Sequence, residues 1–172
     1  MNVPSCPCSQ AAEALETQLE KKYGASAVLK QPNTKLAAPA REPASGVQTN
    51  KKPQKSVPDG AFLVSVDGAQ MVYVLEAKFY GDVRTSALPP QTSICRTPSH
   101  AFDPIPRTWQ GNIETAARQL AGYAVAAKAL FPAADIVKAY SHQGINDKTK
   151  AMAKQLGIKT FKRIGNSYTD LE

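Results

Sequence analysis

The sequence predicts an α/β fold of the α+β kind, with a central mixed β-sheet flanked by helices. Two apolar segments joined by a tight-turn dipeptide indicate a β-hairpin, and a strand–helix–strand alternation follows nearer the C-terminus. The elements run in the order hairpin, helix, strand, helix, strand, which combines antiparallel and parallel pairing in one sheet. A chain of 172 residues is long enough for one such domain with an appendage.

The hairpin is predicted within residues 57–80, which read VPDGAFLVSVDGAQMVYVLEAKFY. AFLVSV forms the first strand, Asp67-Gly68 the turn, and MVYVLEAKF the second strand. Neither strand carries a charge before Glu76. We therefore expect both strands to be buried on both faces of the sheet.

The remaining elements follow from helical periodicity and from stop signals. Residues 9–23 predict a helix, with Leu15 and Leu19 on one stripe and Gly24 after its end. Residues 112–130 predict the strongest helix, with Asn112 as its cap. The segments DIVKAY and IKTFKR are predicted strands on either side of a helix near residues 147–156. This short return favours a parallel pair of strands.

Two segments are expected to lie outside this framework. Residues 30–57 contain prolines and many basic residues opposed only by Glu42, which predicts a linker or a flexible basic arm. We therefore divide the chain into residues 1–56, an N-terminal helix plus this arm, and residues 57–170, the main domain. Residues 81–111 form a long proline-rich loop, of a length that is usually functional or poorly ordered.

Composition restricts the class of protein and its setting. A net charge of +7 and a pI near 9.4 suit a polyanionic partner, although a basic soluble surface is the plainer explanation. The 3 cysteines do not form a disulfide framework and, with both histidines distant in sequence, predict no structural metal site and a reducing setting. We also expect no membrane span and no ordinary signal peptide.

Charged residues gather at the open end of the predicted hairpin. Asp59 lies 8 residues before Asp67, and Glu76 lies 8 residues after Gly68, so the turn brings Asp59 and Glu76 opposite each other. Glu76 and Lys78 are two residues apart on one strand and therefore point to the same face. The sequence thus predicts two carboxylates and one amine on a patch at the end of a sheet.

These groups suggest metal-assisted hydrolysis of phosphodiester bonds. Two close carboxylates repel each other unless a positive charge lies between them, and a divalent cation supplies that charge. Mg²⁺, or Mn²⁺ in its place, prefers oxygen ligands, which Asp59, Glu76 and the Ala77 carbonyl could provide. Lys78 could orient or deprotonate a water, or stabilise charge on a phosphate. A simple salt bridge at a strand end, with Asp59 in a Pro-Asp-Gly turn, explains the same residues without chemistry.

Pro58-Asp59 followed by Glu76-Ala77-Lys78 resembles the motif of the PD-(D/E)xK nuclease superfamily, which has the restriction-endonuclease-like fold. The resemblance covers roughly residues 57–163 and includes the order of the predicted elements. It implies that Asp59 and Glu76 hold the metal with the Ala77 carbonyl, and that Lys78 positions or activates the attacking water.

A second motif lies on the helix at residues 112–130. Gln119 and Tyr123 are four residues apart, which is similar to the Q-x-x-x-Y signature of the RecB-type branch of that superfamily. The resemblance implies that this pair supports the catalytic patch, whereas an ordinary helix pair is the alternative. Relatives often carry a further acidic residue on an earlier helix. Glu16 is the candidate here, although the long arm that follows argues against it.

The resemblance implies a Mg²⁺-dependent deoxyribonuclease. A small catalytic module on a Pro- and Lys-rich arm is also similar to toxin domains of bacterial polymorphic toxin systems, which are delivered into a rival cell's cytoplasm and neutralised by an immunity protein. Such a partner would be acidic here. A cytoplasmic role in repair, recombination or phage DNA processing would use the same chemistry. Without catalysis, the chain could be a nucleic-acid-binding module of this fold or a protein-interaction domain. RNA as substrate and the mode of cleavage stay open.

Overall fold

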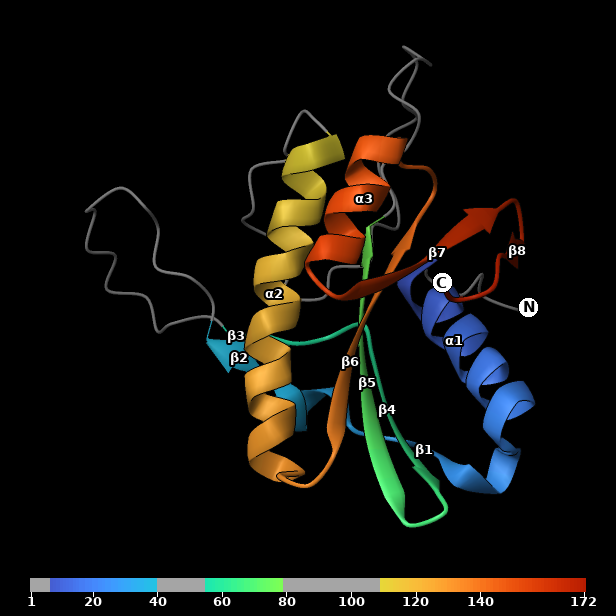
Figure 1. The fold of residues 1–172 in the computed structure, drawn as a ribbon, viewed down its shortest axis with the longest axis vertical. Coiled ribbons are helices and arrows are strands. Elements are labelled where there is room, and N and C mark those ends of the chain that lie inside the picture. Colours follow the sequence, from blue (N-terminus) through green and yellow to red (C-terminus); the bar gives the residue numbers. More distant parts are fainter. Residues whose placement is uncertain (1–6, 40–54, 79–108) are drawn as a thin grey trace, which may run out of the picture.

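The predicted hairpin forms and lies inside a six-stranded sheet (Figure 1). In the computed structural model, which describes residues 7–39, 55–78 and 109–172, strand β4 (Gly60–Val66) pairs antiparallel with β5 (Ala69–Lys78). Asp67 and Gly68 both have positive φ angles, 50° and 81°, as a tight type I′ turn requires. The turn fixes the register, and Gly60 lies opposite Leu75 at the open end.

The complete sheet mixes both kinds of pairing in the order β1-β4-β5-β6-β7-β8. Strand β6 (Asp135–His142) runs parallel to β5, and β7 (Ile158–Ile164) runs parallel to β6. Strands β1 (Val28–Lys30) and β8 (Ser167–Tyr168) add antiparallel edges. The predicted mixed sheet and the predicted parallel return are both confirmed.

Helices cover both faces of the sheet (Figure 1). Helix α1 (Pro7–Tyr23) packs on one face, while α2 (Trp109–Leu130) and α3 (Asp147–Gln155) pack on the other. Asn112 is the expected cap of α2 but lies inside the helix, which begins at Trp109. A favourable capping residue is only a local preference, and it does not end a helix whose preceding residues also adopt helical geometry. Within the described residues, no helix combines the length and apolar character needed to cross a membrane.

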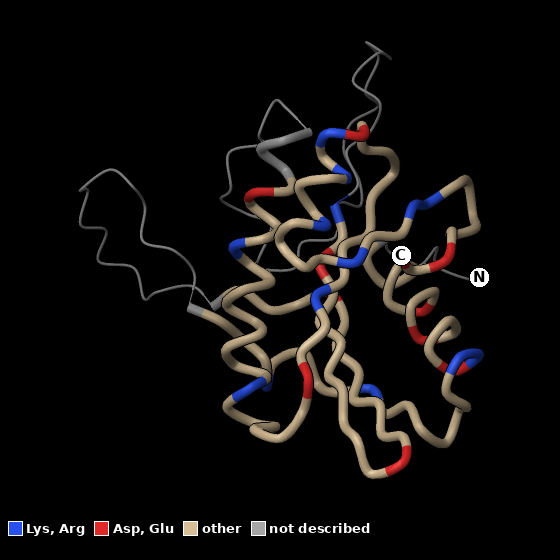
Figure 2. The backbone as a smooth tube through the Cα atoms, in the orientation of Figure 1, with Lys and Arg blue, Asp and Glu red and all other residues tan. Residues whose placement is uncertain are grey.

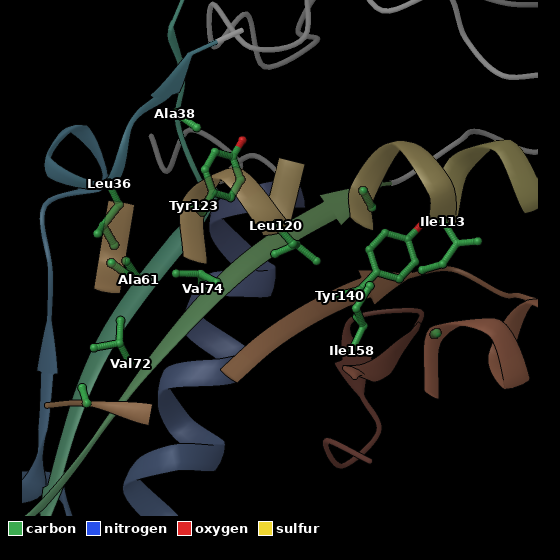
Figure 3. Close-up of a cluster of buried hydrophobic side chains, with 14 residues drawn as sticks. Leu36, Ala38, Ala61, Val72, Val74, Ile113, Leu120, Tyr123, Tyr140 and Ile158 are labelled. Atoms are coloured by element: carbon green, nitrogen blue, oxygen red, sulfur yellow. The ribbon is translucent and has the colours of Figure 1, made fainter. Parts of the chain in front are cut away.

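The alternation of side chains along β5 divides the core into two layers. Val72 and Val74 face α2, whereas Tyr73 and Leu75 face α1. In the first layer, Leu120 and Tyr123 of α2 lie beside the strands of the hairpin (Figure 3). Both layers are buried, which is why both strands of the hairpin lack charges until their open end.

The described part of the predicted arm is folded. After a short 3₁₀ turn, η1 (Ala25–Ala27), and strand β1, the chain forms η2 (Asn33–Leu36) and β2 (Ala38–Pro39), which pairs with β3 (Lys55–Ser56). The sequence pattern did not indicate these elements, because residues 30–39 contain few large apolar residues. One of them, Leu36, is fully buried against α2 and anchors the segment.

The position of α1 bears on how the chain is organised. Ala11, Leu15 and Leu19 of α1 share one hydrophobic cluster with the hairpin. The N-terminal helix is therefore a layer of the same core, and the division of the chain after residue 56 stays a prediction. Residues 40–54 of the arm and residues 81–108 of the proline-rich loop lie outside the described residues.

Candidate active site

The open end of the hairpin holds Asp59 beside Glu76. The Asp59 N–H donates to the Leu75 carbonyl at 2.9 Å, and the Ala77 N–H donates to Asp59 Oδ2 at 2.7 Å. These bonds continue the register of β4 and β5 by one residue, so Asp59 falls opposite Glu76 as the sequence predicts. Asn33 also donates to the Asp59 carbonyl, at 3.3 Å, and ties η2 to the same point.

Glu76 is a buried carboxylate near the C-terminal end of β5, an interior strand of the sheet. Its side chain is 1% exposed, and Lys78 Nζ lies 2.5 Å from Glu76 Oε1. The Lys78 side chain is itself only 10% exposed, as expected for two residues that share one face of β5. A carboxylate leaves water at a cost of several kcal/mol, which only a well-placed partner offsets. The sequence thus places a charge where plain strand packing would favour an apolar side chain.

Tyr123 reaches this carboxylate from α2. Its ring is fully buried in the layer between α2 and the sheet (Figure 3), and its hydroxyl lies 3.4 Å from Glu76 Oε2 and 3.0 Å from the Val57 carbonyl. Burial, and next the negative charge of Glu76, raise the pKa of the Tyr123 hydroxyl well above its usual range. The hydroxyl therefore keeps its proton at any physiological pH and acts as a hydrogen-bond donor.

Ser56 links Tyr123 to Gln119. The oxygens of Ser56 and Tyr123 lie 2.5 Å apart, and Gln119 Nε2 donates to Ser56 Oγ at 3.5 Å. Since Tyr123 donates onward, Ser56 is the donor in their shared bond, and the chain runs from Gln119 through Ser56 and Tyr123 to Glu76 or Val57. The predicted Gln119 and Tyr123 pair therefore fixes the backbone that leads into Asp59.

A glycine lets α2 approach closely enough for these contacts. A Cβ atom at Gly122 would lie 2.8 Å from the Cβ of Ala38 on β2, closer than two carbon atoms pack. Because β2 pairs with β3, which contains Ser56, this close approach also places Ser56 within reach of Tyr123. Gly122, which directly precedes Tyr123 of the motif, is therefore required for this close packing.

Cys8 approaches the same site from the opposite layer. Burial, and next the negative charges of Asp59 and Glu76, raise the pKa of the Cys8 thiol to about 12. A thiol with this pKa is protonated at neutral pH, and Cys8 shares a hydrogen bond with the Asp59 side chain. The first turn of α1 therefore borders the candidate site.

The N-terminal acid expected from the resemblance lies elsewhere. Glu16 forms an exposed ion pair with Lys30 on β1, with 3.5 Å between Glu16 Oε2 and Lys30 Nζ. The structure thus brings together Asp59, Glu76 and Lys78, with Tyr123 and Gln119 beside them, and leaves Glu16 out. The catalytic roles of these residues stay predictions.

The donor set suits a hard divalent cation. Asp59 and Glu76 offer carboxylate oxygens, and the side chain of Lys78 now supplies the positive charge that a metal would supply. No three His, Cys, Asp or Glu side chains in the described part of the chain are placed to share one metal ion. Mg²⁺ accepts one or two protein carboxylates and fills its remaining positions with water or phosphate oxygens. Asp59 and Glu76 therefore fit such an ion, and the Ala77 carbonyl as a third ligand stays a prediction.

Two contributors were missed by sequence reasoning. Ser56 lies just before Pro58-Asp59, but a lone serine gives no sequence signal because its hydroxyl acts only through residues brought close by folding. The spacing of Cys6 and Cys8 suggests only zinc binding. Because Cys8 and Asp59 are far apart in the sequence, their contact could not be predicted from it. The sequence predicts a helix over residues 9–23 but does not indicate which residues its first turn contacts.

Comparison with known proteins adds little. No protein-family model matches the chain, and no curated protein matches it significantly in sequence. Among solved structures, the fold is similar to an XisH family protein from Nostoc punctiforme PCC 73102, with 10% sequence identity and a TM-score of 0.41. The similarity extends over 95% of this chain and 98% of that one. At this score it carries no conclusion about activity.

Proposed function

We propose that this protein is a metal-dependent nuclease, most simply a deoxyribonuclease, with its active site at Asp59, Glu76 and Lys78. The observation that carries the proposal is the Glu76 carboxylate, which is 1% exposed near the end of β5 and paired with Lys78. A buried charge destabilises the fold unless it is paired. Buried ionisable side chains are therefore concentrated at functional sites. Asp59, opposite it, adds the second carboxylate that phosphodiester chemistry uses.

Each residue has a distinct task in this proposal. Asp59 and Glu76 would hold the cation, which supplies Lewis-acid activation of water and neutralises charge on the phosphate. The Ala77 N–H orients the Asp59 carboxylate, and the Tyr123 hydroxyl orients Glu76 Oε2. Lys78 projects from the same face as Glu76, where its ammonium can orient the attacking water and stabilise negative charge that develops on the phosphate.

The distribution of charge supports nucleic acid as the substrate. Lysines and arginines gather over α3 and β7, next to the sheet edge that carries the site (Figure 2). Those on the α3 side are Lys148, Lys150, Lys154 and Lys162. Lys159 and Arg163 alternate with Lys162 along β7 and point to the α1 side of the sheet. Contacts between such side chains and phosphates dominate the affinity of proteins for nucleic acids and do not depend on base sequence. This face would allow a polyanionic strand to reach Lys78.

A cleavage assay tests the proposal. Supercoiled plasmid and total RNA are incubated with the protein in Mg²⁺, in Mn²⁺ or in EDTA, and Glu76→Gln and Lys78→Met are compared with wild type. We expect cleavage that needs the metal and falls by about 100-fold or more in both variants. Glu16→Gln is the matched control, because it also removes a carboxylate from an ion pair but lies away from the site.

Each result has a clear meaning once circular dichroism shows that the variants fold. RNA cleavage alone would keep the site and change the substrate. Intact plasmid and RNA under all conditions, or equal activity of wild type and Glu76→Gln, would contradict a nuclease. A non-catalytic nucleic-acid-binding module would then be the better description.

The toxin role belongs to the same proposal but depends on the resemblance and on the basic arm. An acidic immunity protein would bind the basic face over α3 and β7 through charge complementarity. Expression in a bacterial host provides the test, since an active toxin slows growth and damages DNA, whereas Glu76→Gln does not. Normal growth with an enzyme that cleaves plasmid in vitro would favour repair, recombination or phage DNA processing.

A further inference from the structure

A cavity with polar lining lies at the same end of the sheet as the candidate active site. It has a volume of about 240 Å³ and is formed by the end of β6, the middle of β7, the first turn of α3 and residues 169 and 172. Its ionisable and hydroxyl side chains include His142, Asp147, Lys150, Thr160, Lys162 and Glu172. Since one water occupies about 30 Å³, a phosphate group with its waters fits this volume.

The cavity and the active site lie at the same end of the strands and on the same face of the sheet. His142 on β6 is the register partner of Lys78 on β5 and of Lys162 on β7. Neighbouring strands lie about 4.8 Å apart, so the cavity begins one to two strands from Lys78. The His142 ring stacks on Tyr140, which belongs to the layer under α2, where Tyr123 meets Glu76. A single strand of nucleic acid could therefore contact both places.

His142 gives this cavity a buried polar group that the fold does not use. The residue is 5% exposed, and its Nδ1 has no hydrogen-bond partner among the described residues. A buried polar atom without a partner is uncommon and needs an explanation. Because Nδ1 is enclosed, Nε2 is the ring nitrogen left for a ligand, and in the tautomer with the proton on Nε2 it is a donor.

The charges that act on His142 favour an anion at this end of the cavity. Burial, and next the positive charges of Lys162 and Lys150, lower the pKa of His142 to about 4, so the ring is neutral at pH 7 and lies in a positive field. Lys150 is engaged by Glu172, with 2.5 Å between Lys150 Nζ and Glu172 Oε2. Lys162, in contrast, has no ion-pair partner in the part of the chain that the structure describes. Lys162, the neutral His142 ring and the Asp147 carboxylate therefore face the cavity, and of the two charges it is the positive one of Lys162 that acts on the ring.

A metal ion explains the cavity less well. His142, Asp147 and Glu172 all line it, but no such trio within residues 7–39, 55–78 and 109–172 is placed to share a metal ion. The side-chain charges that act on His142 are also both positive, which would oppose a cation.

We propose that the cavity bounded by His142 and Lys162 binds a phosphate group of the nucleic-acid strand whose cleaved bond lies at Glu76 and Lys78. The proposal rests on the proposed function for its source of phosphate. Lys162 supplies the charge and His142 supplies a hydrogen-bond donor. Glu172 competes with the ligand for Lys150, and because both side chains are more than half exposed, this pair is weak and easily displaced.

The first experiment tests the cavity without any nuclease activity. Inorganic phosphate is titrated into ¹⁵N-labelled protein in EDTA, and the imidazole ¹⁵N signals of His142 are followed, with chloride at equal ionic strength as the reference. We expect a saturable shift that Lys162→Gln abolishes and Lys159→Gln retains. Lys159 is the matched control, because it lies on the same strand but its charge acts on Tyr23, on the α1 side of the sheet. No shift with phosphate would overturn the proposal.

The second experiment identifies the source of the phosphate. Binding of a fluorescent single-stranded oligonucleotide is measured in EDTA over a range of salt concentrations. We expect Lys162→Gln to raise Kd about fivefold and to reduce the salt slope by about one, whereas Lys159→Gln changes Kd less than twofold. Glu172→Gln is expected to lower Kd about twofold, because it removes the competing carboxylate.

The outcomes separate this inference from the proposed function. If phosphate shifts His142 while Lys162→Gln and Lys159→Gln bind the oligonucleotide equally, the cavity takes free phosphate and the nucleic-acid part is wrong. If wild type cleaves plasmid and phosphate leaves His142 unchanged, the nuclease stands and the cavity proposal fails. If neither plasmid nor RNA is cleaved but Lys162 governs oligonucleotide affinity, the cavity stands as a site for nucleic-acid phosphate and the catalytic proposal fails.

Discussion

Two ion pairs in this protein have the same length and opposite surroundings. Glu76 and Lys78 lie 2.5 Å apart with side chains that are 1% and 10% exposed, and Glu172 and Lys150 lie 2.5 Å apart with side chains that are 62% and 55% exposed. Both pairs lie at the same end of the sheet, on β5 and beside β7. The two pairs therefore differ mainly in how far their side chains are exposed to water.

Water decides what each pair can do. In the exposed pair both charges stay hydrated, so their attraction is small and screened by salt, and either partner can be exchanged for another ion. In the buried pair each charge has lost most of its hydration and depends on the other. The first arrangement suits a displaceable contact at the mouth of a binding cavity. The second suits a carboxylate that must keep its charge and position for chemistry.

The largest effect is expected when the buried pair is broken. Lys78→Met leaves Glu76 buried without its cation, so the free energy of unfolding should fall by about 3–5 kcal/mol. Lys150→Met should leave it unchanged within error, because that pair is exposed. Urea denaturation at pH 7.5 measures both. The double variant Glu76→Gln/Lys78→Met should recover part of the loss, and equal losses for Lys78→Met and Lys150→Met would refute the comparison.

The next effect concerns His142, which lies between the two regions. Its folded-state pKa, about 4, is below the ordinary value of 6.5, so the unfolded chain binds a proton before the native protein does. Stability is therefore full above about pH 7 and falls as the pH drops from 6.5 toward 4, by at most about 3 kcal/mol. Urea denaturation of wild type and His142→Gln across this range should show the slope in wild type alone. If wild type and His142→Gln lose stability equally as the pH falls, the folded state does not lower the pKa of His142 and the prediction is wrong.

A smaller effect is expected from the network that holds the buried pair. Tyr123→Phe removes the hydroxyl that contacts Ser56, Val57 and Glu76 while keeping the ring in the core. We expect a loss of about 1–2 kcal/mol in the free energy of unfolding and a further loss of cleavage activity. Tyr23→Phe is the control, because it removes a hydroxyl that bonds to Tyr73 in the middle of β5, away from Glu76. An unchanged cleavage rate in Tyr123→Phe would separate the motif from catalysis.

The smallest effect is expected at the exposed pair itself. Glu172→Gln should not alter unfolding measurably, and any difference from wild type should vanish in 0.5 M NaCl, since salt screens exposed charges. Thermal denaturation at low and high salt provides the measurement. A stability loss that persists at high salt would mean that Glu172 acts through packing at the end of the chain.

The central part of the site could be predicted because it depends on local rules. Asp67-Gly68 selects a tight turn, the turn sets the register, and the register places Asp59 opposite Glu76. The alternation of β5 then puts Glu76 and Lys78 on one face. Similarly, four-residue spacing on α2 places Gln119 and Tyr123 on the same side. Turn chemistry and strand periodicity need no knowledge of the rest of the fold.

Other features could not be predicted because they join segments that only the packed fold brings together. The contact of Cys8 with Asp59 depends on how α1 docks on the sheet, and the bond of Ser56 with Tyr123 depends on the close approach at Gly122. The sequence pattern places His142 just after a strand, but β6 extends to it and buries it between Lys78 and Lys162. Glu16, the candidate acidic residue on the earlier helix, forms an ion pair with Lys30 on β1 instead.

The sequence by itself thus determined the hairpin, the two strands that follow it, the three α-helices, the register of the hairpin and the face on which the charged residues lie. These follow from periodicities of two and about four residues and from the conformational freedom of one glycine in a turn. The tertiary structure alone decided which charges lose their water, which hydroxyls form hydrogen bonds with one another, and that Lys162 lines a cavity beside His142. Burial and charge pairing are sums over neighbours from all segments of the chain, and those neighbours are fixed only when both helical layers close on the sheet.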